Sequence, residues 1–137
     1  MKWNLLTVGK PSLEYARVGA GEYVRRLQRQ TDFTWTPVKA LPETKPPGQF
    51  WLVLDERGEP LSTAALRAKV DGWERHAVKQ ISVLISGADG HDPATRSQAD
   101  CLLALSALTL QHELALVVFL EALYRVYSIK RGEPYHR

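Results

Sequence analysis

The last three residues, Tyr135, His136 and Arg137, are the kinds of side chain that act on nucleic acids. An aromatic ring stacks on a base, an imidazole titrates near neutral pH, and a planar guanidinium binds phosphate or a developing anion. Upstream, Glu121 and Arg125 are one helical turn apart with the acidic residue first, which is the favoured order for an ion pair on a helix face. Two plainer interpretations stay open, a frayed chain end and an ordinary helix-surface ion pair.

The excess positive charge of the chain is concentrated at this end. The sequence has 18 Lys+Arg and 15 Asp+Glu, a net charge of only +3. The segment from Arg125 to Arg137 contains four Lys/Arg and one Glu, so it carries the same excess by itself. Whole-chain charge therefore gives no argument for nucleic-acid binding, and any such surface must be local.

Two apolar runs each lead into a loop that suits a ligand. ISVLI leads into the glycine-bearing loop at Gly87, and residues 101–105 lead into SALTLQ at 106–111. Open α/β sheets bind ligands at the carboxyl ends of their strands, and glycine lets the backbone approach a ligand closely. For the loop at Gly87, a plain tight turn remains an equal alternative.

Strands and helices alternate along the chain, with Ser12 expected to cap the first helix. This pattern predicts a single α/β domain over residues 1–137, with a mostly parallel sheet of about five strands and flanking helices. The proline-rich stretch 39–49 is predicted to be a loop and residues 55–60 a turn. Strands are predicted over 2–8, 33–38, 50–54, 81–85 and 101–105, and helices over about 12–29, 62–77, 93–100 and 112–129.

Composition argues against several other classes of protein. Cys101 is the only cysteine, which excludes an internal disulfide and a cysteine-rich zinc site and makes a reducing compartment the expectation. A metal loop using Asp89, His91 and Asp92 has little support, so no metal is expected. No apolar run is long enough to span a membrane, and the N-terminus has too short an apolar core for a signal peptide. We therefore expect a cytoplasmic protein without a membrane partner.

Three motifs stand out in the last third of the chain: S-x-L-T-L-x-H-x-L from Ser106, L-E-x-L-Y-R from Leu120, and a terminal P-Y-H-R. An opening strand that ends in V-G-K and a helix that contains E-Y-x-x-R accompany them. Together they resemble the pseudouridine-N3 methyltransferases of large-subunit ribosomal RNA, which belong to the SPOUT class of knotted methyltransferases. The resemblance covers nearly the whole chain and is most specific from Ile81 onward and at Leu54-Asp55.

The resemblance implies a C-terminal trefoil knot from about Ile81 and a homodimer. It also implies methyl transfer to N3 of a pseudouridine in ribosomal RNA of the large subunit or the assembled ribosome. In this family the tail of one subunit helps complete the partner's active site, and matching residues here are Arg125, Tyr135, His136 and Arg137. The cofactor S-adenosylmethionine is held by three loops, which correspond here to Leu54, Gly87, Ser106, Ala107, Leu108, Thr109, Leu110 and Gln111.

The chemistry of such a reaction suits these side chains. N3 of the uridine must lose a proton, so a positive environment from Arg125 and Arg137 would stabilise the developing anion. His136 is an alternative as a general base, ranked lower because a chain-terminal imidazole has few residues to hold it.

Several positions differ from the family pattern. Ser86 stands where the first glycine of a pair is usual, Gln111 where a proline is, and Leu116 where an arginine is common. Residues 39–49 are too few for the helix that most relatives carry there. These differences keep open an alternative, a non-catalytic ribosome-binding or assembly factor on the same fold. A third hypothesis is an α/β nucleotide-binding protein unrelated to RNA.

Overall fold

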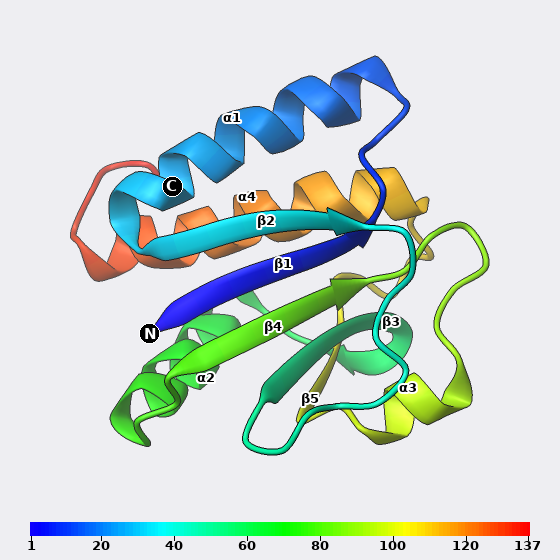
Figure 1. Cartoon of the computed structure of the whole chain (residues 1–137). Coiled ribbons are helices and arrows are strands. Elements are labelled where there is room, and N and C mark those ends of the chain that lie inside the picture. Colours follow the sequence, from blue (N-terminus) through cyan, green and yellow to red (C-terminus); the bar gives the residue numbers. More distant parts are fainter.

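The computed structural model describes all residues from 1 to 137, and its strands and helices alternate as the pattern predicts (Figure 1). The five strands form one sheet in the order β2-β1-β4-β3-β5, and every neighbouring pair is parallel. The predicted α/β class with a parallel sheet is thus confirmed, while the trefoil knot stays a prediction. The elements are β1 (Lys2–Val8), α1 (Glu14–Gln30), β2 (Asp32–Val38), β3 (Phe50–Pro60), α2 (Thr63–Arg75), β4 (Gln80–Ile85), α3 (Pro93–Ser97), β5 (Cys101–Ala104) and α4 (His112–Lys130).

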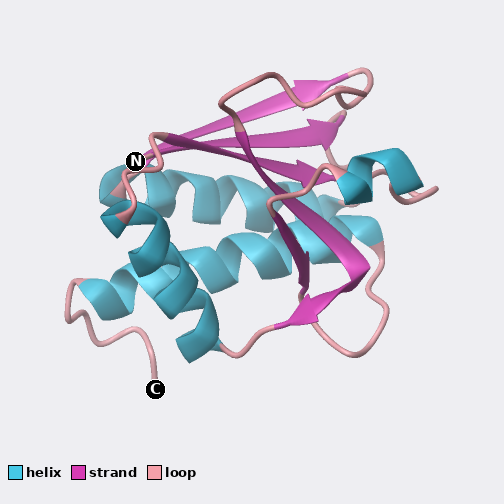
Figure 2. Cartoon of the chain, turned by 90° about the horizontal axis from the view of Figure 1, so that it is seen from below, coloured by secondary structure: helices cyan, strands magenta, loops and turns pink.

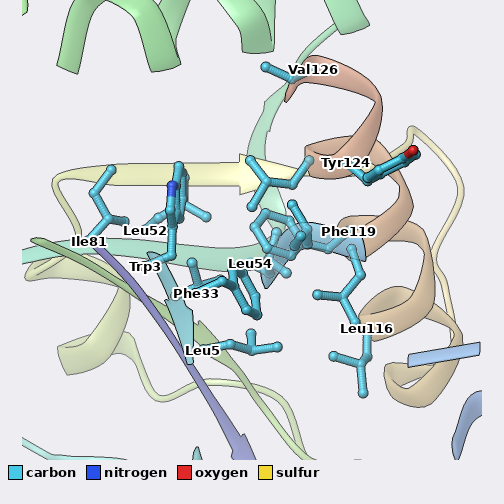
Figure 3. Close-up of a cluster of buried hydrophobic side chains, with 14 of the residues drawn as sticks. Trp3, Leu5, Phe33, Leu52, Leu54, Ile81, Leu116, Phe119, Tyr124 and Val126 are labelled. Atoms are coloured by element: carbon cyan, nitrogen blue, oxygen red, sulfur yellow. The ribbon is translucent and has the colours of Figure 1, made fainter. Parts of the chain in front are cut away.

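The main core lies between the sheet and helices α1, α2 and α4 (Figures 2 and 3). Successive side chains of a strand point to opposite faces. Trp3 and Leu5 therefore enter this core, whereas Trp51, Val53 and Leu84 form a smaller cluster on the other face. In that smaller cluster the loop 39–49 contributes Leu41, so a short loop covers part of the sheet where no helix is present. Core residues contributed by α4 include Leu116, Phe119, Leu120, Leu123 and Val126.

Strand β3 is longer than the sequence suggests. Residues 55–60 were predicted to be a turn, which was wrong, because β3 continues to Pro60 and pairs with β5 on both sides of a register shift. Leu54 and Glu59 both face Leu103 of β5 across this irregularity. At Gly58, a Cβ would lie 2.6 Å from the Leu102 carbonyl oxygen, so only glycine allows the two strands to approach here. The charged residues, Gly58 and Pro60 resemble a turn. The segment is a strand because it pairs with β5, more than 40 residues later in the chain, and a local sequence pattern does not report such pairing.

The start of α1 is also held differently from the prediction. The N-cap residue is Leu13 rather than Ser12, and neither side chain caps the helix. Instead, the Glu113 carboxylate in the first turn of α4 accepts the backbone N–H groups of Ser12 at 3.1 Å and Leu13 at 2.8 Å, and the Ser12 hydroxyl at 3.0 Å. These donors lower the pKa of Glu113, chiefly through the Leu13 N–H. The amino ends of α1 and α4 are thereby tied together.

None of the helices is both long enough and apolar enough to cross a membrane.

Candidate functional site

A pocket of about 570 Å³ is lined by Leu54 to Arg57, in the middle of β3, and by the loops that follow β4 and β5. Leu54 pairs with Ile85, the last residue of β4, so the β3 residues after Leu54 and the loop after β4 emerge at the same edge of the sheet. All three predicted loops contribute to the pocket wall, and Ala107 is the one predicted cofactor residue that does not line it. The predicted residues that do line it are Leu54, Gly87, Ser106, Leu108, Thr109, Leu110 and Gln111.

The loop after β4 forms a turn and also lines the pocket, so its two interpretations are compatible. The Gly90 N–H donates to the Gly87 carbonyl at 3.2 Å, and Gly90 has a φ of +76°. A glycine is therefore required at Gly90 rather than at Gly87. A Cβ at Gly87 would meet only the Val8 Cβ at 3.9 Å, so this position can accept a side chain without disturbing the backbone.

The loop at 106–111 is fixed by side-chain hydrogen bonds at its start, middle and end. Ser106 Oγ accepts the N–H of Leu108 at 2.9 Å, and Gln111 Oε1 caps α4 by accepting the N–H groups of Glu113 at 2.9 Å and Leu114 at 3.0 Å. Gln111, which departs from the family pattern, thus has a definite structural role. Thr109 Oγ1 donates to Glu56 Oε2 at 2.7 Å, which links this loop to β3 beyond Leu54.

Sequence reasoning missed the charge of this pocket. Asp55 is neutralised, since it accepts the N–H of Arg57 at 2.8 Å and lies 3.6 Å from the Arg96 guanidinium. Glu56 and Asp89 also line the pocket and make no ion pair. The lining thus holds three carboxylates, on Asp55, Glu56 and Asp89, and one guanidinium, on Arg57, which lies 4.0 Å from Asp55, so an excess of negative charge favours a cation. The only sequence signal was that Glu56 follows a strand-end pair, Leu54-Asp55.

His91 places a buried polar atom in the pocket wall. Its side chain lines the pocket, the residue is only 9% exposed, and its Nε2 has no hydrogen-bond partner in the chain. Burial lowers the pKa of His91, so the imidazole is neutral at pH 7. The weakly supported metal loop is not found, because no three His, Cys, Asp or Glu side chains are grouped to hold an ion.

The C-terminal tail is not frayed but folded back onto its own chain. The Tyr135 hydroxyl lies 2.9 Å from the Tyr23 hydroxyl and donates to Glu121 Oε1 at 3.1 Å. Its ring meets Tyr124 edge-on, with centroids 4.8 Å apart, and the Arg125 guanidinium lies 4.9 Å from its centroid. The predicted ion pair between Glu121 and Arg125 is present, with Nε and Oε1 3.0 Å apart. Burial raises the pKa of Tyr135 above its ordinary value, so the hydroxyl keeps its proton.

The basic residues near the tail divide into engaged and available groups. Lys130 pairs with Asp71 and lies 3.7 Å from Glu74, while Arg131 donates to the Gln30 carbonyl at 3.0 Å. Lys130 is thus already neutralised by carboxylates of α2. His136 is exposed but its Nδ1 lies 3.0 Å from Arg125 Nη1, so Arg137 is the tail cation that is exposed and has no side-chain partner.

Within one chain the pocket and the tail are far apart. His112 lines the pocket and Arg125 lies beneath the tail, thirteen residues later on the same helix. At 1.5 Å per residue this separates the two by about 20 Å. Figure 1 shows the tail, in red, at the end of the molecule opposite to the arrowheads of β1, β2 and β4. The structure therefore brings the predicted cofactor residues together and the predicted catalytic residues together, but not the two groups with each other.

Comparisons with known proteins match this architecture. A family model described as "Predicted SPOUT methyltransferase" matches residues 1–136. A protein named ribosomal RNA large subunit methyltransferase H, from a strain of Thermus thermophilus, is 45% identical over 139 residues, which cover 100% of this chain and 99% of the relative. The protein of the same name from Deinococcus deserti is 41% identical over 145 residues and covers all of both chains.

A solved structure supports the fold alone. The crystal structure of a probable methyltransferase from Bordetella pertussis Tohama I superposes with a TM-score of 0.55 at 10% sequence identity. The match covers 91% of this chain and 95% of that one.

Proposed function

The chain belongs to the SPOUT methyltransferase family, and we propose that it methylates N3 of a pseudouridine in large-subunit ribosomal RNA with S-adenosylmethionine as the methyl donor. The observation that carries the proposal is the pocket that the middle of β3 and the loops after β4 and β5 form at one edge of the sheet. Full-length identity with proteins named ribosomal RNA large subunit methyltransferase H supports the choice of substrate. Family membership also leads us to propose the C-terminal trefoil knot, and a ribosomal substrate leads us to propose the cytoplasm as its location.

The residues of the pocket suit S-adenosylmethionine. Leu54, Leu108 and Leu110 offer apolar surface for an adenine ring. Glu56, which has no cationic partner, suits a positively charged ligand. When bound, this cofactor supplies an electrophilic methyl group on a positively charged sulfur.

The tail residues suit the other half of the reaction. The N3 proton of the acceptor base must leave, and the Arg137 guanidinium favours the anion that develops, while Arg125, which is paired with Glu121, contributes less. In the observed arrangement Arg125 Nη1 lies 3.0 Å from His136 Nδ1. Because a guanidinium only donates, Nδ1 accepts, and the proton of the neutral imidazole is then on Nε2. We therefore keep the assignment of His136 to binding and charge stabilisation, ahead of a role as general base.

We infer that the working enzyme is a homodimer in which the tail of one subunit reaches the pocket of the other. About 20 Å of helix separates the two groups within one chain, so a second copy can bring them together where one chain does not. Val18 on α1 is 62% exposed and Leu114 on α4 is 37% exposed. These helices pack closely, since a Cβ at Gly19 would lie 3.3 Å from Val117. Together they offer an apolar surface that a second copy would cover.

The proposal is tested on ribosomal RNA itself. Mass spectrometry of large-subunit RNA from cells with and without this protein should show one N3-methylpseudouridine that disappears with the gene. The modification should return with the wild-type protein and not with Gly87→Arg, a variant whose side chain fills the pocket and adds a positive charge. Ribosome binding without methyl incorporation from labelled S-adenosylmethionine would contradict the proposal and favour a non-catalytic ribosome-binding factor.

A further inference from the structure

The anchoring of the tail depends on a residue of α1 that none of the motifs assigns to the reaction. Tyr23 lies at the middle of α1, and its hydroxyl is 2.9 Å from that of Tyr135, 112 residues later in the chain. The Tyr135 hydroxyl has a single proton, which it donates to Glu121 Oε1 at 3.1 Å. Tyr23 is therefore the donor to Tyr135. The Tyr23 hydroxyl thus donates to Tyr135, and the Tyr135 hydroxyl donates to Glu121. Both hydroxyl protons are used in hydrogen bonds.

Neighbouring groups hold this hydrogen-bonded chain in place on both sides. The Tyr23 ring packs against Tyr124 at a centroid distance of 5.9 Å, and the Arg26 guanidinium lies 5.6 Å and 5.5 Å from the two ring centroids. Glu22 orients Arg26, with Oε1 and Nε 2.8 Å apart. The segment Glu22-Tyr23-Val24-Arg25-Arg26 is the E-Y-x-x-R motif of the first helix. In this motif Tyr23 contacts the tail, Arg26 contacts the two rings beside the tail, and Glu22 contacts Arg26.

The Tyr135 ring is also badly placed to stack on a base. The Tyr124 ring meets it edge-on, the Arg125 guanidinium lies 4.9 Å from its centroid, and its hydroxyl is occupied on two sides. His136 and Arg137 follow directly and are exposed. Tyr135 therefore anchors the tail on its own subunit, and His136 and Arg137 extend beyond this anchor into solvent.

We propose that Tyr23 is a positioning residue for methyl transfer, because with Glu121 it anchors Tyr135 of its own subunit and so fixes the course on which His136 and Arg137 reach the partner's pocket. This inference rests on the proposed composite site of the homodimer. It assigns a function to the motif of α1, and it changes the role of Tyr135 from contact with RNA to anchoring of the tail. Tyr23 acts only through the tail and does not touch the reacting atoms.

A dimer of two different subunits tests the proposal. One subunit, the tail donor, carries Gly87→Arg, which blocks its pocket and leaves its tail intact. The other, the pocket donor, lacks residues 134–137 and keeps its pocket. Two affinity tags select the mixed dimer, whose one complete site joins the tail of the first subunit to the pocket of the second. Tyr23→Phe, which removes a single hydroxyl, is then placed in either subunit.

The proposal predicts an asymmetric result. In the tail donor, Tyr23→Phe should lower the kcat for methyl transfer by about fivefold, the effect of losing one such hydrogen bond, with the Kd for S-adenosylmethionine unchanged. In the pocket donor, the same substitution should change neither quantity. Equal loss from both placements would show a general effect of Tyr23 on folding or dimerisation and would overturn the inference, as would no loss from either. An inactive mixed dimer with intact Tyr23 would instead overturn the composite site itself.

Discussion

The pocket and the tail cluster differ in how completely their polar groups are satisfied. In the pocket, His91 Nε2 has no hydrogen-bond partner, and the Glu56 carboxylate is bonded only to a neutral hydroxyl. In the tail cluster, the Tyr135 hydroxyl has partners on two sides, and Arg125 contacts a carboxylate, a ring and an imidazole. Unsatisfied buried groups cost stability unless a ligand pairs with them, so the pocket has the character of a binding site. In the tail cluster the polar side chains already have partners within the chain, so the cluster can contact another molecule without rearranging.

This difference suggests why one chain would hold both halves of a site and still need a second copy. Helix α4 connects the two regions, since its amino end lines the pocket and its carboxyl half carries Glu121 and Arg125. A rigid helix keeps them apart by a fixed length, so the tail cannot fold into its own pocket. Binding of the methyl donor and stabilisation of the acceptor should therefore be separable by mutation.

The largest effect should come from removing the tail. Deletion of residues 134–137 should lower kcat for methyl transfer by at least about 100-fold, as loss of charge stabilisation in an active site does. The Kd for S-adenosylmethionine, measured by calorimetry, should stay within about twofold, since the residues that line the pocket all precede the tail in sequence and remain in place. A tail deletion that abolished binding of the methyl donor would break the distinction between the two regions.

A smaller effect is expected from the residue that ties the pocket end of α4 to α1. Glu113→Ala removes the acceptor for Ser12 and Leu13 and should lower the free energy of unfolding by about 1–2 kcal/mol. Urea denaturation measures this loss. Glu14→Ala, an exposed position in the first turn of α1, is the control and should have a clearly smaller effect. Equal destabilisation by both variants would refute the capping role of Glu113.

Charge in the pocket should discriminate the donor from its product. Glu56→Gln keeps an acceptor for Thr109 and removes the charge, so the Kd for S-adenosylmethionine should rise by about fivefold. The Kd for S-adenosylhomocysteine, which lacks the positive sulfur, should rise less. Glu59→Gln, an exposed residue of β3 outside the pocket lining, should change neither value. The same increase for both ligands after Glu56→Gln would show that the carboxylate does not sense the sulfonium charge.

The smallest effect concerns pH and the buried imidazole. The ordinary pKa of His91 is 6.5, and burial lowers it in the fold. Below pH 6.5 the unfolded chain therefore binds a proton that the folded chain rejects, so stability is full above this pH and falls as the pH decreases through and below it. Thermal unfolding of wild type and His91→Asn between pH 7.5 and 5.5 should show a smaller loss of Tm in the variant. If Tm fell equally with pH in wild type and variant, groups other than His91 would cause the pH dependence.

The sequence predicts the pocket well because local signals define it. Apolar runs that end at Leu54 and Ile85 identify parallel strands, and their following loops must meet at one edge of the sheet. The extension of β3 was missed because the backbone of β5 at Leu102, a non-local partner, pairs with a segment that resembles a turn. Ala107 lies within the predicted loop at 106–111 but does not line the pocket, and its role in cofactor binding stays a prediction.

The chemistry of the tail could be predicted from its residue types, but the contacts that its side chains make could not. Its chemistry is visible in the last three residues, and the ion pair of Glu121 with Arg125 follows from helical spacing. Its anchoring to Tyr23 joins residues 112 positions apart, and no periodicity reports such a contact. The expected stacking of a base on Tyr135 came from the amino-acid type alone, and the covered ring now favours the anchoring role that we propose.

Methyl transfer by the mixed dimer of Gly87→Arg and tail-deleted subunits, with Tyr23 intact in both, tests the central claim most directly. Each homodimer should be inactive, because one lacks a usable pocket and the other lacks the tail. The mixed dimer has one complete site of two, so labelled methyl groups should enter large-subunit RNA at about half the wild-type rate per dimer. A mixed dimer as inactive as its parents would contradict the account, because pocket and tail would then have to act within one chain.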